Sequence, residues 1–271
     1  MARISIAMER PGHEAIRVVP LHQPKIRVAL GADQSELWQS IPRHDLKGVK
    51  LKYFGGPLLS NVEVFVIYWG SQFTQGKLLG YPDRLDAFFD TILDSPLMDQ
   101  MSEYSVKGHS IGRGRRIGST IISTAAPKSH ISDSALRTQL SKWIDAKKAV
   151  PAPTANALYF VFTEPGITVS MGGSKSCSSF CGYHDAIGSS IYYAVMPFPS
   201  CSGCLGEMSA FDALCVTASH ELCEAVTDPI PGSSWYNEQY GEVGDICAWQ
   251  YRKYQGYLIQ KEWSNKAGKC V

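Results

Sequence analysis

Residues 208–228 place the strongest constraint on how this chain can fold. Their apolar members recur at the spacing of one buried helical face, and they are Phe211, Leu214, Cys215, Ala218, Leu222 and Ala225. His220, Glu221 and Glu224 fall on the opposite side. We therefore predict a long helix that packs one face into the core and carries three ionisable side chains on the other.

These three residues have the spacing of a metal site. Side chains four positions apart on a helix stack one turn above the other, so the imidazole of His220 and the carboxylate of Glu224 can bind one ion. Glu221 has the position of the glutamate that accepts a proton from activated water in the His-Glu-x-x-His zinc hydrolases. We expect His220 and Glu224 to be metal ligands and Glu221 to be a catalytic base. The alternative is that all three form a solvated polar face.

The carboxylate of Glu224 replaces the second histidine of that pattern and bears on the identity of the ion. Added negative charge weakens the pull of an ion on water, and oxygen ligands favour harder cations. We expect zinc as the cofactor, with manganese or calcium as alternatives.

A third ligand has to come from outside this turn of the helix. Asp228 would lie roughly 12 Å along the axis from His220, which is too far for both to bind one ion. Because Pro229 disfavours helical geometry at the residue before it, we expect Asp228 to fix a turn or to support the ligands. Asp245 and Glu242 return on a later loop. We expect Asp245, or else Glu242, to complete the metal site.

His184 and Tyr236 are further candidates for the catalytic site. His184 ends a short extended piece at residues 181–184, from which it can face His220 as a ligand or as a donor to a developing oxyanion. Tyr236 has a similar possible role. A purely structural role for each side chain remains the alternative.

The rest of the chain predicts a sheet covered by helices. Residues rich in β-branched and aromatic side chains predict strands at 62–69, 117–122, 158–162 and 191–196. Apolar periodicity and capping residues predict helices that begin at residues 82–83 and 132–133. A turn at residues 188–190 can join the extended piece at 181–184 to the last strand as a hairpin. The fold class is α+β, layered: a mixed twisted sheet, two backing helices, a long metal-binding helix and a small loop-rich C-terminal part.

The chain divides into an N-terminal arm and one domain. Residues 1–45 are rich in Pro, His and Arg and only weakly periodic, which is typical of an extended arm. Residues 46–271 form the domain, with an upper part at 46–228 and a loop-rich lower part at 229–271.

Eight cysteines are many for a protein of a reducing compartment. Most of them cluster: Cys177 and Cys181, Cys201 and Cys204, and Cys247 and Cys270. We expect disulfides, with Cys247 and Cys270 tying down the C-terminal part. The alternative is a structural zinc site of four thiolates from the first two clusters. Cys215 and Cys223 are expected to be packing residues.

Composition narrows the choice of partners. A net charge of +1 gives no general attraction to nucleic acid or to an anionic membrane. The apolar runs are shorter than the roughly 18 to 20 residues that span a bilayer, and the first residues lack the apolar core of a secretory signal. We expect a peptide or small-molecule substrate, and neither nucleic acid nor membrane as a partner.

The predicted order of elements is similar in architecture to the zincin metalloprotease fold, which ends in a long metal-binding helix. In that fold an edge strand above the helix aligns an extended substrate. The resemblance implies that residues 181–184 or their neighbours lie at the rim of a cleft.

Four segments resemble the phosphate-induced, exordium-like family over roughly residues 50–250: residues 55–59, residues 181–184, the pair Cys201 and Cys204, and residues 220–229. Plant members of that family are extracellular and linked to growth control, so the resemblance implies a secreted protein and favours disulfides. After Asp228 the chain departs from the plant pattern and looks more like microbial relatives.

We therefore predict a zinc-dependent hydrolase, with a peptidase as the first choice. His220, Glu224 and Asp245 would hold the ion, and Glu221 would be the base. The alternatives are a secreted binding or signalling protein with a structural or vestigial metal site, and a metal-dependent enzyme that acts on a small molecule.

Overall fold

The computed structural model describes residues 19–21, 46–124 and 127–271, together with the backbone of four short strands nearer the N-terminus. These strands are β1 (Met8–Arg10), β2 (His13–Ile16), β4 (Ile26–Val28) and β5 (Leu37–Gln39), paired as β1 with β2 and β4 with β5. The predicted arm at residues 1–45 therefore lies largely outside the described residues.

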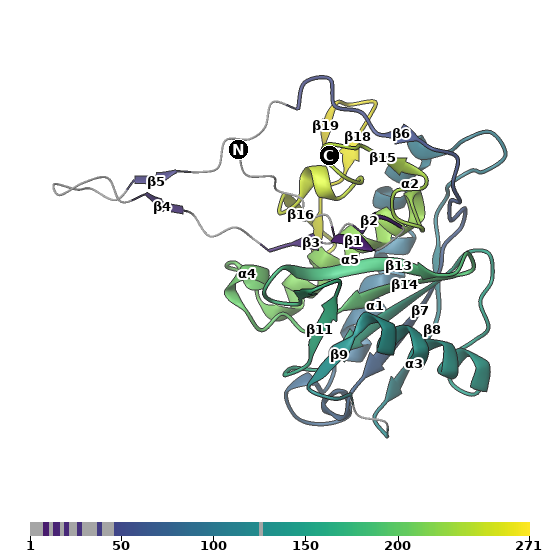
Figure 1. Ribbon diagram of the computed structural model, residues 1–271, viewed down its shortest axis with the longest axis vertical. Coiled ribbons are helices and arrows are strands. Elements are labelled where there is room, and N and C mark those ends of the chain that lie inside the picture. Colours follow the sequence, from purple (N-terminus) through teal and green to yellow (C-terminus); the bar gives the residue numbers. More distant parts are fainter. Residues whose placement is uncertain are drawn as a thin grey trace.

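A six-stranded mixed sheet forms the centre of the molecule (Figure 1). Its strands, in spatial order, are β3 (Val19–Pro20), β13 (Phe180–Ile187), β14 (Ile191–Met196), β10 (Ala157–Thr163), β7 (Glu63–Trp69) and β8 (Arg115–Ile122). Strands β14, β10, β7 and β8 run parallel, and β13 is antiparallel to β14. The four strands and the hairpin predicted from the sequence are confirmed.

The central strands are buried on both faces, which explains their nearly continuous apolar sequences. In β7, Val64 and Val66 face one hydrophobic cluster, whereas Phe65 and Ile67 face the other. The alternation follows from the period of two along a strand. The sheet therefore has a core on each side.

Five α-helices lie in the described part of the chain: α1 (Tyr81–Leu93), α2 (Pro96–Met101), α3 (Asp133–Ala146), α4 (Ser202–Leu205) and α5 (Ala210–Thr227). Helices α1 and α5 share one core, and α3 packs into the core on the opposite face of the sheet. The two helices expected to back the sheet are thus on different sides of it. Ser132 caps α3 as predicted, because its hydroxyl accepts a hydrogen bond from the backbone N–H of Ala135 at 3.2 Å.

Several short elements complete the fold. A three-stranded sheet holds β9 (His130–Ser132), β11 (Thr168–Met171) and β12 (Ser174–Lys175), and two-stranded pairs join β6 (Lys52–Tyr53) to β15 (Trp235–Tyr236), β16 (Tyr251–Tyr254) to β17 (Tyr257–Gln260), and β18 (Trp263–Ser264) to β19 (Lys269–Cys270). Single 3₁₀ turns are η1 (Ser71–Phe73), η2 (Gly76–Leu78), η3 (Ser102–Tyr104) and η4 (Asp245–Cys247).

Helix α5 lies between the sheet and the C-terminal part of the chain, which is yellow in Figure 1. It packs against β13 and β14 on one side and against β17 on the other. The hydroxyl of Ser219 accepts a hydrogen bond from the backbone N–H of Gln260 at 2.9 Å and so joins α5 to β17. The helix is therefore enclosed, and the C-terminal part is an integral layer of the fold.

Three disulfides hold the chain together: Cys177–Cys201, Cys181–Cys204 and Cys247–Cys270. The last one ties down the C-terminal part, as expected. Because a sulfur in a disulfide is not a thiolate, the first two argue against the alternative zinc site. Cys215 and Cys223 are free and buried. These disulfides indicate an oxidising environment.

None of the helices in the described residues is long and apolar enough to cross a membrane.

Candidate metal centre

The ionisable face of α5 is buried. His220, Glu221 and Glu224 are each 0% exposed, because the C-terminal part covers the side of the helix that the sheet does not. The alternative of a solvated polar face is therefore wrong. Burying three ionisable side chains is costly unless each finds a partner of opposite charge or a metal ion.

His220, Glu224 and Asp245 converge on one point, with their ligand atoms all within 4.8 Å of one another. Nε2 of His220 lies 3.0 Å from Oε1 of Glu224 and 4.0 Å from Oδ1 of Asp245. The same Oε1 of Glu224 accepts a hydrogen bond from the backbone N–H of Asp245 at 3.0 Å, which fixes the loop to the helix. Asp245 is therefore the loop carboxylate that the fold brings to His220 and Glu224.

Gly244 allows the loop to come this close. A Cβ atom at this position would lie 2.8 to 2.9 Å from ring atoms of His220, nearer than carbon atoms approach without displacement. Any other residue would push the loop, and Asp245 with it, away from the helix. A glycine next to the predicted acidic ligand was a signal for this close approach that the sequence interpretation did not use.

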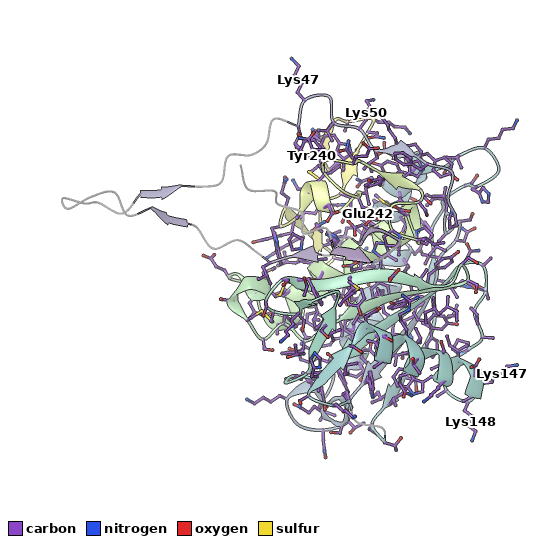
Figure 2. The ribbon with its side chains drawn as sticks, viewed as in Figure 1. Lys47, Lys50, Lys147, Lys148, Tyr240 and Glu242 are labelled. Carbon is purple, nitrogen blue, oxygen red and sulfur yellow. A yellow bond between two sulfur atoms is a disulfide. The ribbon has the colours of Figure 1, made fainter. Side chains whose placement is uncertain are left out.

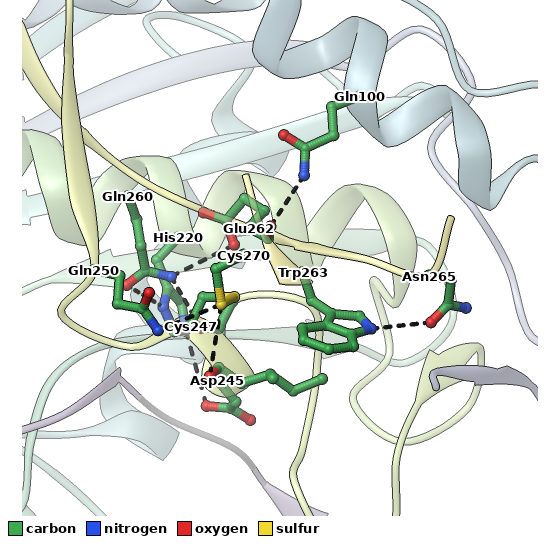
Figure 3. Close-up of a disulfide and its surroundings, with 12 residues drawn as sticks. Gln100, His220, Asp245, Cys247, Gln250, Gln260, Glu262, Trp263, Asn265 and Cys270 are labelled. Carbon is green, nitrogen blue, oxygen red and sulfur yellow. Dashed lines mark hydrogen bonds and ion pairs between the residues drawn. A yellow bond between two sulfur atoms is a disulfide. The ribbon is translucent and has the colours of Figure 1, made fainter. Parts of the chain in front are cut away.

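Gln260 on β17 orients the ring of His220 (Figure 3). Its Oε1 accepts a hydrogen bond from Nδ1 of His220 at 3.0 Å, and its Nε2 donates to the carbonyl oxygen of Gly244 at 3.0 Å. The second bond fixes which end of the amide faces the histidine. Burial lowers the pKa of His220, but Glu224, Glu221 and Asp245 outweigh it and raise the pKa well above its usual range, so the metal-free ring favours a second proton on Nε2. With Nδ1 bonded to Gln260, an ion that replaced this second proton would meet the lone pair of Nε2.

His184 lies on β13, and its side chain contacts Glu221 on α5. Its Nδ1 is 2.9 Å from Oε2 of Glu221, and its Nε2 is 3.1 Å from the carbonyl oxygen of Asp228. A carbonyl oxygen and a carboxylate both accept, so both ring nitrogens donate and the ring is an imidazolium. Burial lowers the pKa of His184, but Glu221, Glu224 and the Asp228 carbonyl outweigh it and raise the pKa to about 9.

His184, Glu221 and Glu224 form a second group with ligand atoms within 4.8 Å. Nδ1 of His184 faces Glu221 and Nε2 faces the Asp228 carbonyl oxygen, so an ion in this group would have to displace one of these contacts. Its geometry instead holds the Glu221 carboxylate in place. The sequence placed His184 opposite the helix but gave no means of pairing it with Glu221.

The carboxylate of Glu242 and the carbonyl oxygen of Asp228 both lie near Nε2 of His184. Glu242, labelled in Figure 2, is fully buried, and its Oε1 lies 3.6 Å from Nε2 of His184. Burial, together with the nearby carboxylates of Glu224, Asp228 and Asp245, raises the pKa of Glu242 well above its usual range. Glu242 therefore lies beside His184, whereas the group that converges on one point consists of His220, Glu224 and Asp245.

Asp228 fixes a turn, as the sequence predicted. It ends α5, and its carboxylate accepts hydrogen bonds from the backbone N–H groups of Gly232, Ser233 and Ser234 at 2.7 to 3.1 Å. This turn directs the chain away from the helix and toward the loop that carries Asp245.

Tyr236 lies on β15, and its ring packs against Phe54 with the ring centroids 5.4 Å apart. The catalytic role of Tyr236 stays a prediction.

The donor set fits a cation. Among the described residues, five buried carboxylate oxygens have no hydrogen-bond donor: Oε1 of Glu221, Oε2 of Glu224, both oxygens of Glu242 and Oε1 of Glu262. Nε2 of His220 also has no hydrogen-bond partner, although it lies in ion-pair contact with Glu224. Unpaired buried oxygens of this kind are destabilising, and a divalent ion among them would remove the penalty. An imidazole with two carboxylates is a set that zinc accepts.

Comparison of the chain with models of known protein families finds no match, and comparison with curated proteins finds no significant similarity.

Proposed function

We propose that this protein is a zinc-dependent hydrolase, most simply a peptidase, with the ion held by Nε2 of His220, a carboxylate oxygen of Glu224 and a carboxylate oxygen of Asp245. The observation that supports the proposal is the convergence of these three atoms beside a fourth side chain, Glu221, that His184 holds. Manganese or calcium remain alternatives, since two of the three ligands are carboxylates.

The ion would supply Lewis acidity, which polarises a carbonyl group and lowers the pKa of water. Glu221 would accept the proton of the attacking water through Oε1, the oxygen that no hydrogen bond uses. The contact from His184 to Oε2 keeps the carboxylate from rotating and leaves Oε1 as the proton acceptor. Burial raises the pKa of Glu221, which makes its carboxylate a stronger base than an exposed glutamate.

Two features of the fold support a zincin-like arrangement within this proposal. The antiparallel strand β13 lies beside the metal-binding helix α5, and it carries His184 toward the site. The three disulfides support a secreted protein. Kinship with the exordium-like family stays part of the proposal and rests on the sequence segments alone.

The replacement Glu221→Gln tests the proposal. The amide keeps the size of the side chain but cannot accept the proton, so peptide hydrolysis should fall by roughly 10²- to 10⁴-fold while stoichiometric zinc remains bound. Elemental analysis and cleavage of a peptide library measure the two outcomes, with Glu207→Gln, an exposed residue, as the matched control. A wild type without stoichiometric metal, or a Glu221→Gln variant with full activity, would contradict the proposal.

The complete burial of His220, Glu221 and Glu224 favours a second candidate, a binding or signalling protein whose ion is structural. Structural metal sites are closed, whereas catalytic sites keep one position open to water or substrate. This candidate predicts bound metal and no turnover of peptide or small-molecule libraries, and the same two measurements distinguish it from the hydrolase.

A further inference from the structure

The two-stranded pair of β6 and β15 exposes an aromatic pair of side chains. In its antiparallel register Tyr53 lies opposite Trp235, and Lys52 lies opposite Tyr236. Because side chains alternate between the two faces of a strand, Lys52 and Tyr236 share one face with Phe54, two residues after Lys52. The rings of Phe54 and Tyr236 pack together with their centroids 5.4 Å apart, although Phe54 remains 49% exposed. This face of the pair is therefore aromatic and reaches solvent.

The other face of β6 and β15 holds these rings in place. Tyr53 and Trp235 pack against the core shared by α1 and α5, and their ring centroids lie 5.6 Å apart. The backbone N–H of Phe54 donates to the carbonyl oxygen of Ser234 at 2.8 Å. A ring that is already ordered loses little conformational freedom when it binds a partner. The exposed aromatic pair is therefore preorganised for recognition.

Lysines lie around the aromatic pair. Residues 46–56 and 263–271 contain no Asp or Glu and five lysines: Lys47, Lys50, Lys52, Lys266 and Lys269. The side chain of Asn265 joins the two segments, because its Oδ1 accepts from the backbone N–H of Leu51 at 2.9 Å and its Nδ2 donates to the Leu51 carbonyl oxygen at 2.9 Å. Nζ of Lys50 in turn donates to the carbonyl oxygen of Asn265 at 3.4 Å. The two lysine-bearing segments therefore form one surface next to the aromatic pair.

The carboxylates of Glu103 and Glu238 balance only part of this positive charge. Glu103 accepts hydrogen bonds from the backbone N–H groups of Asn265 and Lys266 at 3.2 and 3.3 Å, and Glu238 is exposed just after β15. With both counted, the five lysines leave an excess of three positive charges, in a chain whose net charge is +1. Apart from Lys47, these lysines form no salt bridge within the described part of the chain. The excess charge is therefore local and available to an anionic partner.

We propose that this lysine–aromatic surface, formed by Lys50, Lys52, Phe54, Tyr236 and Lys266, binds an acidic polysaccharide of the uronate class. Each sugar of a polyuronate carries one carboxylate and an apolar C–H face, which matches separate lysines around exposed rings. The rings would cover the apolar face of a sugar, and the lysines would pair with the carboxylates. The three disulfides favour this partner over a nucleic acid, since they indicate an oxidising environment.

Titration of immobilised sodium polygalacturonate with the full chain tests the inference. The wild type should bind saturably, and added salt should weaken binding because it screens exposed charges. The double substitution Lys50→Gln/Lys52→Gln should weaken binding roughly tenfold. The matched control is Lys147→Gln/Lys148→Gln, which removes the same charge at the opposite end of the molecule (Figure 2) and should keep the wild-type affinity.

A second set of variants tests the aromatic pair. Phe54→Ala removes the exposed ring and should weaken binding about threefold or more, with the salt dependence unchanged because no charge is lost. Phe54→Tyr keeps a ring at this position and should bind as the wild type does. Leu79→Ala truncates another exposed apolar side chain and should have no effect on binding. Thermal melts verify that each variant is folded.

Three results would overturn the inference: a wild type that does not bind polygalacturonate, an equal loss of affinity in the two double lysine variants, or unchanged binding by folded Phe54→Ala. Equal binding of fully methyl-esterified polygalacturonate, which is neutral, would also overturn it, as would tighter binding of single-stranded RNA or of phosphatidylserine vesicles. The titration requires neither zinc nor turnover, so its outcome is separate from that of the Glu221→Gln experiment on the proposed hydrolase.

Discussion

Replacing Gln260 by methionine should weaken zinc binding although Gln260 is not one of the proposed ligands. The amide accepts the hydrogen bond from Nδ1 of His220 and donates to the carbonyl oxygen of Gly244, at 3.0 Å in each case. Methionine has a similar length and can make neither bond. The histidine then loses the partner that selects the tautomer with a free lone pair on Nε2.

The size of the effect follows from these two bonds. Loss of a residue that orients a metal-bound histidine typically costs 10- to 100-fold in metal affinity, or about 1.4 to 2.7 kcal/mol. The metal-free protein should also become less stable, since a buried donor or acceptor left without a partner costs roughly 1 to 3 kcal/mol. Both groups are enclosed, because His220 is fully buried and Gly244 lies against its ring.

Competition with a zinc-binding dye measures the affinity, and urea denaturation of the metal-free protein measures the stability. Gln250→Met is the matched control: Gln250 lies in the same C-terminal part, and its side chain donates to Sγ of Cys270 at 3.4 Å (Figure 3). The control should keep the zinc affinity of the wild type. A folded Gln260→Met protein with unchanged zinc affinity would refute the assignment of His220 as a ligand oriented by Gln260.

Two further predictions concern metal removal and pH. The unpaired oxygens of Glu221, Glu224 and Glu242 are buried, so we expect bound zinc to stabilise the fold. Zinc at 100 times its Kd should raise the free energy of unfolding by about 2.7 kcal/mol, and a chelator should abolish this gain in a thermal melt. Identical melting curves with and without chelator would contradict the prediction. On the other face of the sheet, burial raises the pKa of Asp133 above its ordinary value of 3.8, against the lowering effect of hydrogen bonds from Tyr193 and Tyr183. The native protein therefore holds a proton that the unfolded chain releases, so the stability from this group is complete below 3.8 and is lost as the pH rises through the native pKa. Asp133→Asn should reduce this loss of stability with rising pH, measured by urea denaturation over the acid range. If the free energy of unfolding of the variant falls with pH as steeply as that of the wild type, Asp133 is not the cause.

Most of the regular structure could be predicted from the sequence because its signals are local. The apolar run of β7, the capping Ser132 of α3 and the period of α5 each reflect contacts that any such segment has to make. The turn at Asp228 followed from Pro229 in the same way. The strands β9, β11 and β12 were missed, because they are two to four residues long and too short for a periodic pattern.

The enclosure of the site could not be predicted from the helix alone. Periodicity identifies the apolar face of α5, but whether the other face meets water depends on the C-terminal part, which packs there through β17. The pairing of His184 with Glu221 is likewise a contact between residues 37 positions apart, fixed by the register of β13 on α5. Gln260 is 40 positions from His220, and no local pattern connects the two.

The most direct test of the metal centre is an anomalous difference map at the zinc absorption edge, from crystals of the full chain grown with zinc. We predict one peak about 2.0 to 2.2 Å from Nε2 of His220 and from carboxylate oxygens of Glu224 and Asp245. A map without a peak at these three residues, or with the ion bound instead by His184, would contradict it.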